Sequence, residues 1–275
     1  MVEINSWSDS LTKFLKSSNE DERVIALFNE SILPEIRQQF CKYTLNWLEI
    51  GIGDGNKTLG FANAITSSRC FAKINLTICE PSLDWIVKIE SSCIEKQIYE
   101  AAMVDFVRTT IEDFLETATP LHYDFISMVQ VMYSASIKDA MLRYIDRKLE
   151  QKPSLIWVDV EDKSSDFNII RKQLLSKGLN VVHSFADEYL SDLKRKGIHF
   201  KTFNTVDKIC RIDVMDILNN DSHWIFPFTL GCTTNEFRNS KITERKLVFN
   251  IVRSFVKELK HPVLNIPDVS ILAFI

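Results

Sequence analysis

The chain has 275 residues, of which 45% are hydrophobic and 25% are charged, a mixture that excludes disordered, collagen-like and coiled-coil proteins. Its 33 basic and 37 acidic residues give a net charge of −4 without a long run of either sign. A protein that tracks nucleic acid or an anionic membrane needs a basic surface, which this balance does not supply. We therefore expect a small neutral or cationic ligand and no nucleic-acid or membrane partner. We also expect a monomer.

The cysteines, the histidines and the amino terminus indicate the compartment and the metal chemistry. Six cysteines occur without a CxxC pair or the dense spacing of a secreted disulfide scaffold, so we expect reduced thiols. The five histidines have no metal-ligand spacing, and we expect no metal. The first residues lack the pattern of a signal peptide, and no stretch approaches the ~20 apolar residues of a membrane span. These features predict a cytoplasmic protein.

The first two thirds of the chain have the pattern of an α/β fold. Residues 9–40 carry apolar side chains three and four apart, which predicts a helical arm. Strand and helix patterns then alternate up to residue 186, which predicts a parallel sheet of the Rossmann-like type with helices on both faces. The predicted strands are 44–50, 72–79, 102–108, 123–129 and 153–160. The clearest predicted helices are 82–97 and 136–149, and a further helix is predicted at 56–67.

The sequence after residue 186 is mixed. It contains a helix pattern at 187–197, a strand pattern at 199–203, an aromatic segment at 223–228, a long helix pattern at 239–260 and an apolar run at 269–275. We predict three segments. Residues 1–40 form a helical arm that covers the substrate site, residues 41–186 form the cofactor-binding core, and residues 187–275 supply cap segments and the final strands of the sheet.

A glycine cluster follows the first predicted strand. Gly51, Gly53 and Gly55 are three of only seven glycines in the chain, and a helix pattern begins directly after them. A plain tight turn would also explain them, but glycine at this place lets a ligand approach the backbone. Glu49 and Asp54 would oppose the pyrophosphate of a dinucleotide, whereas they suit the sulfonium and ammonium groups of S-adenosylmethionine. The loop therefore favours S-adenosylmethionine as the cofactor.

An acidic residue at the end of the second predicted strand strengthens this interpretation. Glu80 stands where a carboxylate can accept hydrogen bonds from both ribose hydroxyls of a nucleoside. The residues that we predict to bind the cofactor are Glu49, Gly51, Gly53, Asp54, Gly55, Glu80, Pro81, Ser82, Thr110 and Val129.

Four segments carry a resemblance to a known family. They are LEIGIGDG at 48–55, EPSLDWIVK at 80–88, YDFISMVQVMY at 123–133 and VLNIPDVSILAFI at 263–275. With these segments the chain resembles class I S-adenosylmethionine-dependent methyltransferases and, within them, the histamine N-methyltransferases. The resemblance runs over nearly the whole chain. It implies a class I methyltransferase fold and transfer of a methyl group to a nitrogen of a small amine, such as histamine or a related imidazole amine.

The resemblance also implies roles for single residues. Glu20, at the end of FLKSSNE, takes the place of a glutamate that binds the amine of the substrate, and Gln130 that of a glutamine that hydrogen-bonds the imidazole. These two are the predicted catalytic residues. Further substrate-binding candidates are Trp7, Tyr133, Phe167, Arg171 and Trp224.

Each of these residues has a simpler interpretation. Gln130 is also a polar residue at a strand end, Glu20 an acid at a helix start, and Arg171 a solvated helix residue. The aromatic candidates could all be core residues rather than a cage for a cation or an imidazole.

Three positions depart from the family pattern. Ser134 replaces a second pocket tyrosine, Arg171 falls where a tryptophan is expected, and Pro267 stands in place of an asparagine that touches the ligand. A different substrate, such as a carboxylate-bearing imidazole or an amino-acid derivative held by Arg171, is therefore an alternative. A cofactor-binding scaffold without catalysis is a further alternative.

Overall fold

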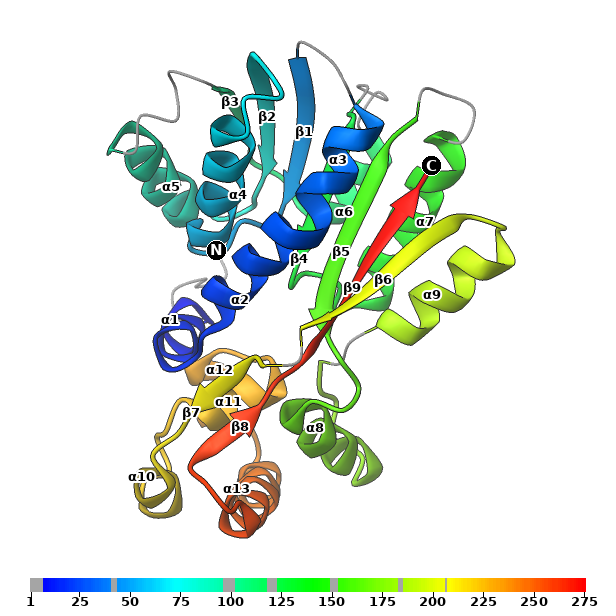
Figure 1. The fold of residues 1–275 in the computed structure, drawn as a ribbon. Helices are drawn as coiled ribbons and strands as arrows, with labels where there is room; N and C mark the ends of the chain where they lie inside the picture. The colour runs from blue at the N-terminus through cyan, green and yellow to red at the C-terminus, as the bar shows by residue number, and fades with distance from the viewer. Residues whose placement is uncertain are drawn as a thin grey trace. The chain divides into compact units, whose positions relative to one another are not determined.

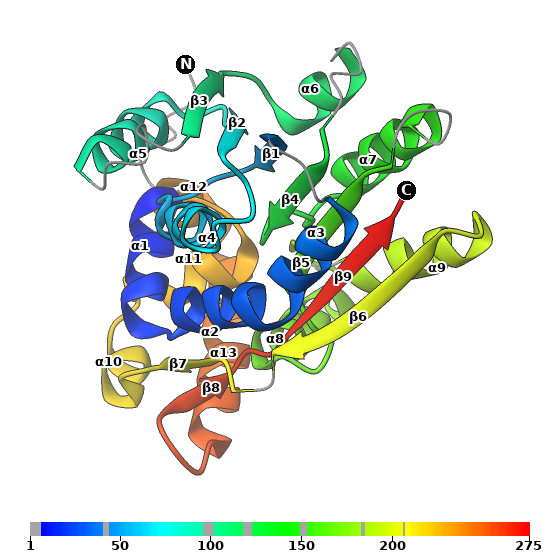
Figure 2. The same ribbon diagram turned by 45° about the horizontal axis from the view of Figure 1, so that its top comes forward.

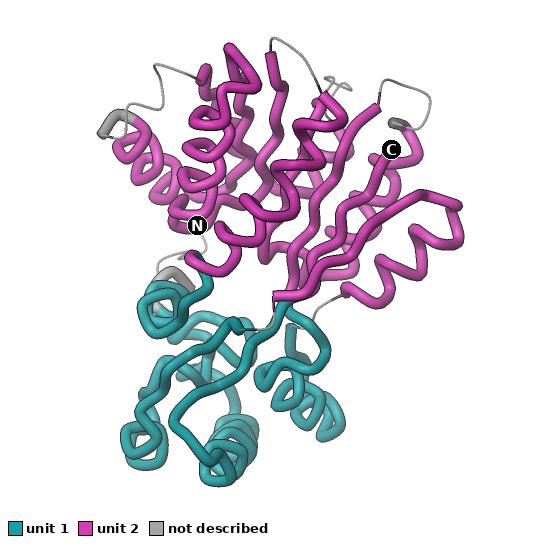
Figure 3. Tube along the Cα trace, in the orientation of Figure 1, with its two compact units in different colours: residues 1–21, 161–184, 206–268 teal, residues 22–160, 185–205, 269–275 magenta. Residues whose placement is uncertain are grey.

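The computed structural model describes residues 7–40, 44–95, 102–117, 123–148, 153–182, 185–205 and 207–275 (Figure 1). The chain forms two compact units (Figure 3). One, here called the sheet unit, comprises Glu22–Val160, Phe185–Thr205 and Val269–Ile275, and the other, the helical unit, comprises Met1–Asp21, Glu161–Ser184 and Val206–Asp268. The residue ranges of the two units alternate along the sequence, and each of the three predicted segments contributes residues to the sheet unit.

The sheet unit is built on seven strands in the order β3-β2-β1-β4-β5-β9-β6. The pairs β3/β2, β2/β1, β1/β4 and β4/β5 are parallel, and Figure 1 shows β9 running opposite to β5 and β6. The strands are β1 Thr44–Ile50, β2 Lys73–Cys79, β3 Ala102–Val107, β4 Phe125–Val129, β5 Leu155–Glu161, β6 His199–Thr205 and β9 Asp268–Phe274. The predicted Rossmann-like α/β fold is confirmed, and the five predicted core strands are correct to within two residues at each end.

Helices cover both faces of the sheet because successive strand residues point to opposite sides (Figure 2). On β1, Trp47 packs with one helical layer and Leu48 with the other. The first layer contains α2 Glu20–Leu27, the π-helical segment Phe28–Ile32, α3 Leu33–Gln39, α4 Asn56–Ser67 and α5 Leu83–Glu95. The second contains α6 Ile111–Thr117, α7 Ala135–Lys148 and α9 Ala186–Arg195.

The helical unit has a separate hydrophobic core rich in phenylalanine. It consists of α1 Trp7–Ser17, α8 Asp166–Ser176, α10 Val214–Asn219, α11 Ile225–Leu230, α12 Thr234–Asn239, α13 Ile242–Glu258 and an antiparallel pair, β7 Ile209–Arg211 with β8 Val263–Asn265. The sequence pattern predicts neither α10 nor this strand pair, since both are short and lack a clear period.

Two predicted helices differ from the structure. The arm at 9–40 is a series of four helical segments rather than one helix. The helix predicted at 239–260 is α13, Ile242–Glu258, which starts three residues later than predicted because Ser240 and Lys241 have non-helical backbone. A capping box between Thr233 and Glu236 begins α12.

Three properties of the described residues bear on the site. No helix among them is long and apolar enough to cross a membrane. Cys70, Cys79, Cys210 and Cys232 are free thiols, and Cys41 lies outside the described residues. Among the described side chains, no group of three or more His, Cys, Asp or Glu residues is arranged to hold a metal ion.

Candidate functional site

The glycine loop connects β1 to α4 in a conformation that only glycine adopts easily. Gly51, Gly53 and Gly55 have φ angles of 72°, 53° and 80°, a region in which a side chain is strained. The backbone N–H of Gly51 donates to the carbonyl of Cys79 at 3.0 Å, which keeps the ends of β1 and β2 together. The loop therefore lies at the carboxyl edge of the parallel strands, beside the place where the strand order reverses between β1 and β4.

The two sides of this loop have different surroundings. A Cβ atom on Gly51 would lie 2.3 Å from Cγ1 of Val131, so the segment after β4 packs directly against the loop. A Cβ atom on Gly53 would meet nothing within 4 Å. The loop is thus closed toward Val131 and open above Gly53, as a cradle for a ligand must be.

Glu80 follows β2 and is turned back toward the glycine loop. Its carboxylate accepts hydrogen bonds from the backbone N–H groups of Ser82, at 2.9 Å, and Ile52. Burial of the carboxylate raises its pKa, and these two hydrogen bonds oppose the rise. The carboxylate is therefore fixed beside the loop, in the position expected for an acceptor of ribose hydroxyls.

Other predicted cofactor residues have side chains that cap helices at the same edge. Ser82 accepts a hydrogen bond from the backbone N–H of Trp85, and Thr110 from that of Asp113. Asp54 accepts from both the backbone and the side-chain amide of Asn56, at the start of α4. Pro81 is exposed, and Val129 is the buried last residue of β4. These residues follow or end the parallel strands at this edge, and their contacts with a cofactor stay predictions.

Glu49 differs from the expectation of a negative charge near the cofactor. Its side chain is buried and accepts hydrogen bonds from the hydroxyl groups of Ser127 and Thr58. Desolvation by burial raises its pKa to about 8, more than these hydrogen bonds lower it. A carboxyl group with this pKa is mostly protonated at neutral pH, so Glu49 is a weak partner for a sulfonium.

Gln130 follows β4 in a strained backbone conformation. Its φ angle is 57°, which is uncommon for a residue with a side chain and occurs often at functional sites. The backbone N–H donates to the carbonyl of Asp159 at 2.7 Å, and Nε2 donates to Oδ2 of the same residue at 3.2 Å. Oε1 accepts a hydrogen bond from the hydroxyl of Tyr133. These contacts fix the orientation of the amide, with Nε2 toward Asp159 and Oε1 toward Tyr133.

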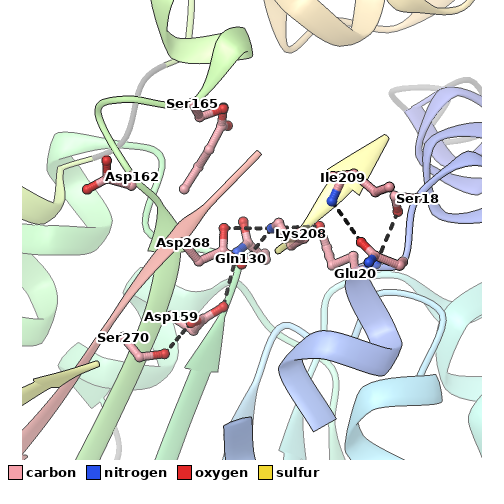
Figure 4. A network of polar contacts seen from close by, with 12 residues as sticks. Ser18, Glu20, Gln130, Asp159, Asp162, Ser165, Lys208, Ile209, Asp268 and Ser270 are labelled. Atoms are coloured by element: carbon pink, nitrogen blue, oxygen red, sulfur yellow. Dashed lines mark hydrogen bonds and ion pairs between the residues drawn. The ribbon is translucent and has the colours of Figure 1, made fainter. Parts of the chain in front are cut away.

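Asp159 is itself held by a second set of contacts (Figure 4). Its Oδ1 accepts a hydrogen bond from the hydroxyl of Ser270, and Trp157 donates to that hydroxyl oxygen at 3.1 Å. All of these residues belong to the sheet unit. A chain of hydrogen bonds thus runs from β9 through β5 to Gln130.

Glu20 has an ion-pair partner in the protein (Figure 4). The ammonium of Lys208 lies 3.2 Å from Oε2 of Glu20 and 2.5 Å from Oδ2 of Asp268. Glu20 is the first residue of α2, Lys208 precedes β7, and Asp268 begins β9. The three residues form a buried cluster in the helical unit.

Arg171 is buried in α8, so the interpretation as a solvated helix residue is wrong. Its guanidinium lies 2.5 Å from a carboxylate oxygen of Glu161, donates to the carbonyl of Thr229 at 3.1 Å, and stacks 5.5 Å above the ring of Phe167. The helix pattern could not show this, because the carboxylate comes from the end of β5 and the carbonyl from α11. A substrate carboxylate would have to compete with Glu161 for this guanidinium.

The buried pair of Arg171 and Glu161 predicts a large loss of stability when one partner is removed. Arg171→Met leaves Glu161 as an unpaired buried charge, and we expect the free energy of unfolding to fall by about 3 to 5 kcal/mol. The exposed pair of Arg143 and Glu116 provides the control, since Arg143→Met should cost less than about 1 kcal/mol. Urea titrations of both variants measure the difference, and equal losses would contradict the assignment.

Two of the aromatic candidates, Phe167 and Trp224, come together in the helical unit, whereas Tyr133 belongs to the sheet unit. Phe228 stacks on Phe14 at 4.6 Å between ring centroids, lies 5.1 Å from Phe167 and lies 5.7 Å from Trp224. Phe14 and Phe228 complete this group although neither is a predicted site residue. Phe14, Phe167 and Phe228 are buried in the core of the unit, and Trp224 is partly buried. The side chain of Trp7 lies outside the described residues.

Two positions that depart from the family pattern have local structural roles. The hydroxyl of Ser134 accepts a hydrogen bond from the backbone N–H of Ile137 and thereby caps α7. The carbonyl of Pro267 accepts from the backbone N–H of Asp162 at 2.8 Å.

Several potential site residues are missed by sequence reasoning. Asp159 and Glu161 had a usable signal, since both are acids at the carboxyl end of an otherwise apolar strand. Nothing in the sequence indicates Lys208 or Asp268, because Lys208 is 188 residues from Glu20 and 60 residues from Asp268.

Comparison with known proteins supports the fold. No protein-family model matches the chain, and no curated protein is detectably similar to it in sequence. Among solved structures, it resembles a cyclopropane-fatty-acyl-phospholipid synthase-like protein from Lactobacillus casei ATCC 334, at 14% identity over 92% of this chain and 91% of that chain, with a TM-score of 0.59.

Two plantazolicin methyltransferases have lower TM-scores. BamL, in complex with a triazolic desmethylPZN analog and SAH, is 18% identical over 97% of this chain and 90% of that chain, with a TM-score of 0.47. BpumL, in complex with SAH, is 14% identical over 96% of this chain and 88% of that chain, also with a TM-score of 0.47. The similarity to the Lactobacillus casei protein and the strand order identify the fold as the Rossmann-like fold of class I methyltransferases.

Proposed function

We propose that the protein is an S-adenosylmethionine-dependent methyltransferase that acts on a nitrogen of a small amine or imidazole compound. The observation that carries this proposal is the cradle at the carboxyl edge of the sheet. This edge carries three glycines with left-handed backbone conformation, an open space above Gly53 and the fixed carboxylate of Glu80. The cradle fits a nucleoside whose ribose hydroxyls are free, since an acid rather than a base follows β2.

When bound, S-adenosylmethionine supplies a methyl group that is already activated by its sulfonium. The protein then has to align a substrate nitrogen with this methyl group and exclude water. Gln130 is suited to the first task because Val131, the next residue, packs against Gly51 of the loop. An amide has two N–H donors and two lone pairs on its oxygen. The hydrogen bonds within the described part of the chain use one of each, which leaves one donor and one acceptor for a ligand.

The fixed orientation of the amide suits a neutral imidazole or amine. One nitrogen of an imidazole can hydrogen-bond to Gln130 while the lone pair of the other faces the methyl group. No covalent nucleophile is required, and the methylated product can lose its proton to water. The imidazole amine histamine is the first compound to test, together with other amines and imidazole amino acids, by mass spectrometry of products formed with deuterium-labelled methyl donor.

Binding of the cofactor depends on Glu80 in this proposal. We expect Glu80→Gln to weaken binding of S-adenosylmethionine by about tenfold to a hundredfold, because a hydrogen bond to a charged group is worth roughly 1.5 to 3 kcal/mol. The glutamine keeps an oxygen that can accept from the backbone of Ser82. Isothermal titration calorimetry measures the effect, with Glu90→Gln on the exposed side of α5 as the control. Equal affinities of both variants and the wild type would remove Glu80 from the site.

A further inference from the structure

The amide of Gln130 is held between a buried carboxylate and a partly exposed tyrosine, and all three residues belong to the sheet unit. Its Nε2 donates to Oδ2 of Asp159 at 3.2 Å (Figure 4), and its Oε1 accepts a hydrogen bond from the hydroxyl of Tyr133. Asp159 has a relative exposure of 0%, whereas Gln130 and Tyr133 are partly exposed. The amide nitrogen is thus directed to the interior, and the amide oxygen to a side chain that solvent reaches.

Asp159 accepts hydrogen bonds at both of its carboxylate oxygens. Oδ2 accepts from Gln130, and Oδ1 accepts from the hydroxyl of Ser270. The oxygen of that hydroxyl accepts in turn from Nε1 of Trp157 at 3.1 Å. Because an indole nitrogen only donates and a hydroxyl has a single proton, Ser270 has to use its proton on Asp159. The directions of these hydrogen bonds therefore follow from the residue types.

The reversed orientation of the Gln130 amide is unfavourable in these surroundings. Exchanging Nε2 and Oε1 would place the amide oxygen against Oδ2 of Asp159, so that two acceptors would face each other in the buried interior. The hydroxyl of Tyr133 does not select between the two orientations, since a hydroxyl both donates and accepts. Asp159 is therefore the residue that selects the orientation of the amide.

The backbone attaches Gln130 both to Asp159 and to the glycine loop. Its N–H donates to the carbonyl of Asp159 at 2.7 Å, which supports the left-handed φ angle of 57°. Val131, the next residue, packs so closely on Gly51 that a Cβ atom there would lie 2.3 Å from its Cγ1. Strained backbone of this kind is concentrated at functional sites. The amide is thus held on a turn that packs against the cradle.

We propose that Asp159 is a positioning residue, which holds the oxygen of the Gln130 amide in place to accept an N–H group of the substrate. The substrate is then a nitrogen compound that carries both an N–H group and a lone pair, such as a neutral imidazole or a primary or secondary amine. This inference rests on the proposed function, because it narrows the class of compounds that is methylated.

The orientation of the amide matters for methyl transfer because the reacting lone pair must stay free. As this lone pair forms the new N–C bond, the C–S bond of the sulfonium breaks and its electron pair stays on sulfur, which becomes a neutral thioether. The substrate gains the positive charge, so its N–H group donates more strongly to the amide oxygen in the transition state than before. The methylated cation then loses a proton to water. A reversed amide would instead donate to the lone pair that has to react.

Two probes that differ by one N–H group test the inference. Imidazole has an N–H group and a lone pair, whereas 1-methylimidazole has only the lone pair. Each is titrated into isotope-labelled protein saturated with S-adenosylhomocysteine, at alkaline pH where both rings are neutral, and NMR follows the backbone amide signals of positions 130 and 131. The wild type should bind imidazole at least about tenfold more tightly, because one hydrogen bond is gained. Equal affinities, or signals that neither probe shifts, would overturn the inference.

Asp159→Asn removes the selection of the orientation, because an asparagine side chain donates as well as accepts. The preference for imidazole should fall to within about threefold, while circular dichroism shows that the variant is folded. Asp139→Asn, at an exposed position of α7, is the matched control and should keep the preference of the wild type. An unchanged preference in folded Asp159→Asn would show that Asp159 does not position the amide.

The double variant Q130E/D159N restores the arrangement with the opposite polarity. The asparagine then donates to the new carboxylate, an oxygen again lies on the side of Tyr133, and the net charge is unchanged. The preference for imidazole should return to at least about tenfold. A folded double variant without this preference would show that the substrate requires the N–H of Gln130 rather than its oxygen, and the inference would fail. This measurement decides the question even where Asp159→Asn does not fold.

The proposed function is tested separately from this inference. Calorimetry measures binding of S-adenosylhomocysteine to the wild type before the probes are added. Absence of binding would overturn the proposed function. The two probes are then titrated without S-adenosylhomocysteine, and the comparison between them still decides whether Asp159 positions the amide.

Discussion

Gly53→Val is expected to abolish measurable binding of S-adenosylmethionine while the sheet remains folded. The backbone at Gly53 has a φ angle of 53°, and a Cβ atom there would enter the open space above the loop. A branched side chain would fill the volume that the cofactor requires and would strain the loop as well. A lost contact energy of about 3 kcal/mol weakens binding roughly a hundredfold, and we expect at least this loss.

Gly197→Val separates the two causes. Gly197 has a φ angle of 69°, and a Cβ atom there would also meet nothing within 4 Å, but it lies between α9 and β6 rather than in the loop. The two variants should therefore lose similar stability in thermal melting followed by circular dichroism. Only Gly53→Val should lose affinity in calorimetry. Native affinity in a folded Gly53→Val variant would show that the loop is not the cofactor site.

The sheet was predictable because its signals are local. A buried parallel strand reads as a short apolar or β-branched run bounded by turn residues, and TLNWLEI and FISMV are such runs. The glycine loop and Glu80 were predictable for the same reason, since each follows a strand directly. Parallel strands carry the residues after them to one edge, so the position of each in the cradle follows from the strand order.

The ion pairs were not predictable because they depend on contacts between distant segments. Nothing near Lys208 in the sequence indicates that it meets Glu20, and Arg171 has the spacing of an ordinary helix residue. Glu20, which the resemblance assigns to a substrate amine, is ion-paired with Lys208 in the structure, and Arg171 is ion-paired with Glu161.

Gln130 depends both on a local signal in the sequence and on contacts with distant segments. Its place after β4 was predictable from the strand, but the left-handed backbone and the partner of its amide were not. Asp159 reaches it from the neighbouring strand, where Val129 is paired with Asp159 in the register of β4 and β5. The orientation of the amide, and hence which group it presents to a ligand, is a property of the assembled sheet.

Burial of Glu49 couples the stability of the sheet unit to pH. Its pKa of about 8 in the folded protein lies above the value of 4.5 that is ordinary for a glutamate. The folded state therefore binds the proton more tightly than the unfolded state does. The stability from this group is fully present below about pH 4.5 and is lost as the pH rises through about 8.

Glu49→Gln removes this titration and keeps the size of the side chain, so the variant should gain stability relative to the wild type as the pH rises. At about 1.4 kcal/mol for each pKa unit, the difference between the two should grow by roughly 3 to 5 kcal/mol between about pH 5 and pH 9. Urea titrations at intervals across this range measure it, and Glu90→Gln on exposed α5 controls for the loss of one carboxyl group. A difference that stays constant with pH would show that Glu49 is ionised in the folded protein. Its carboxylate would then supply the negative charge that the sequence suggests beside the glycine loop.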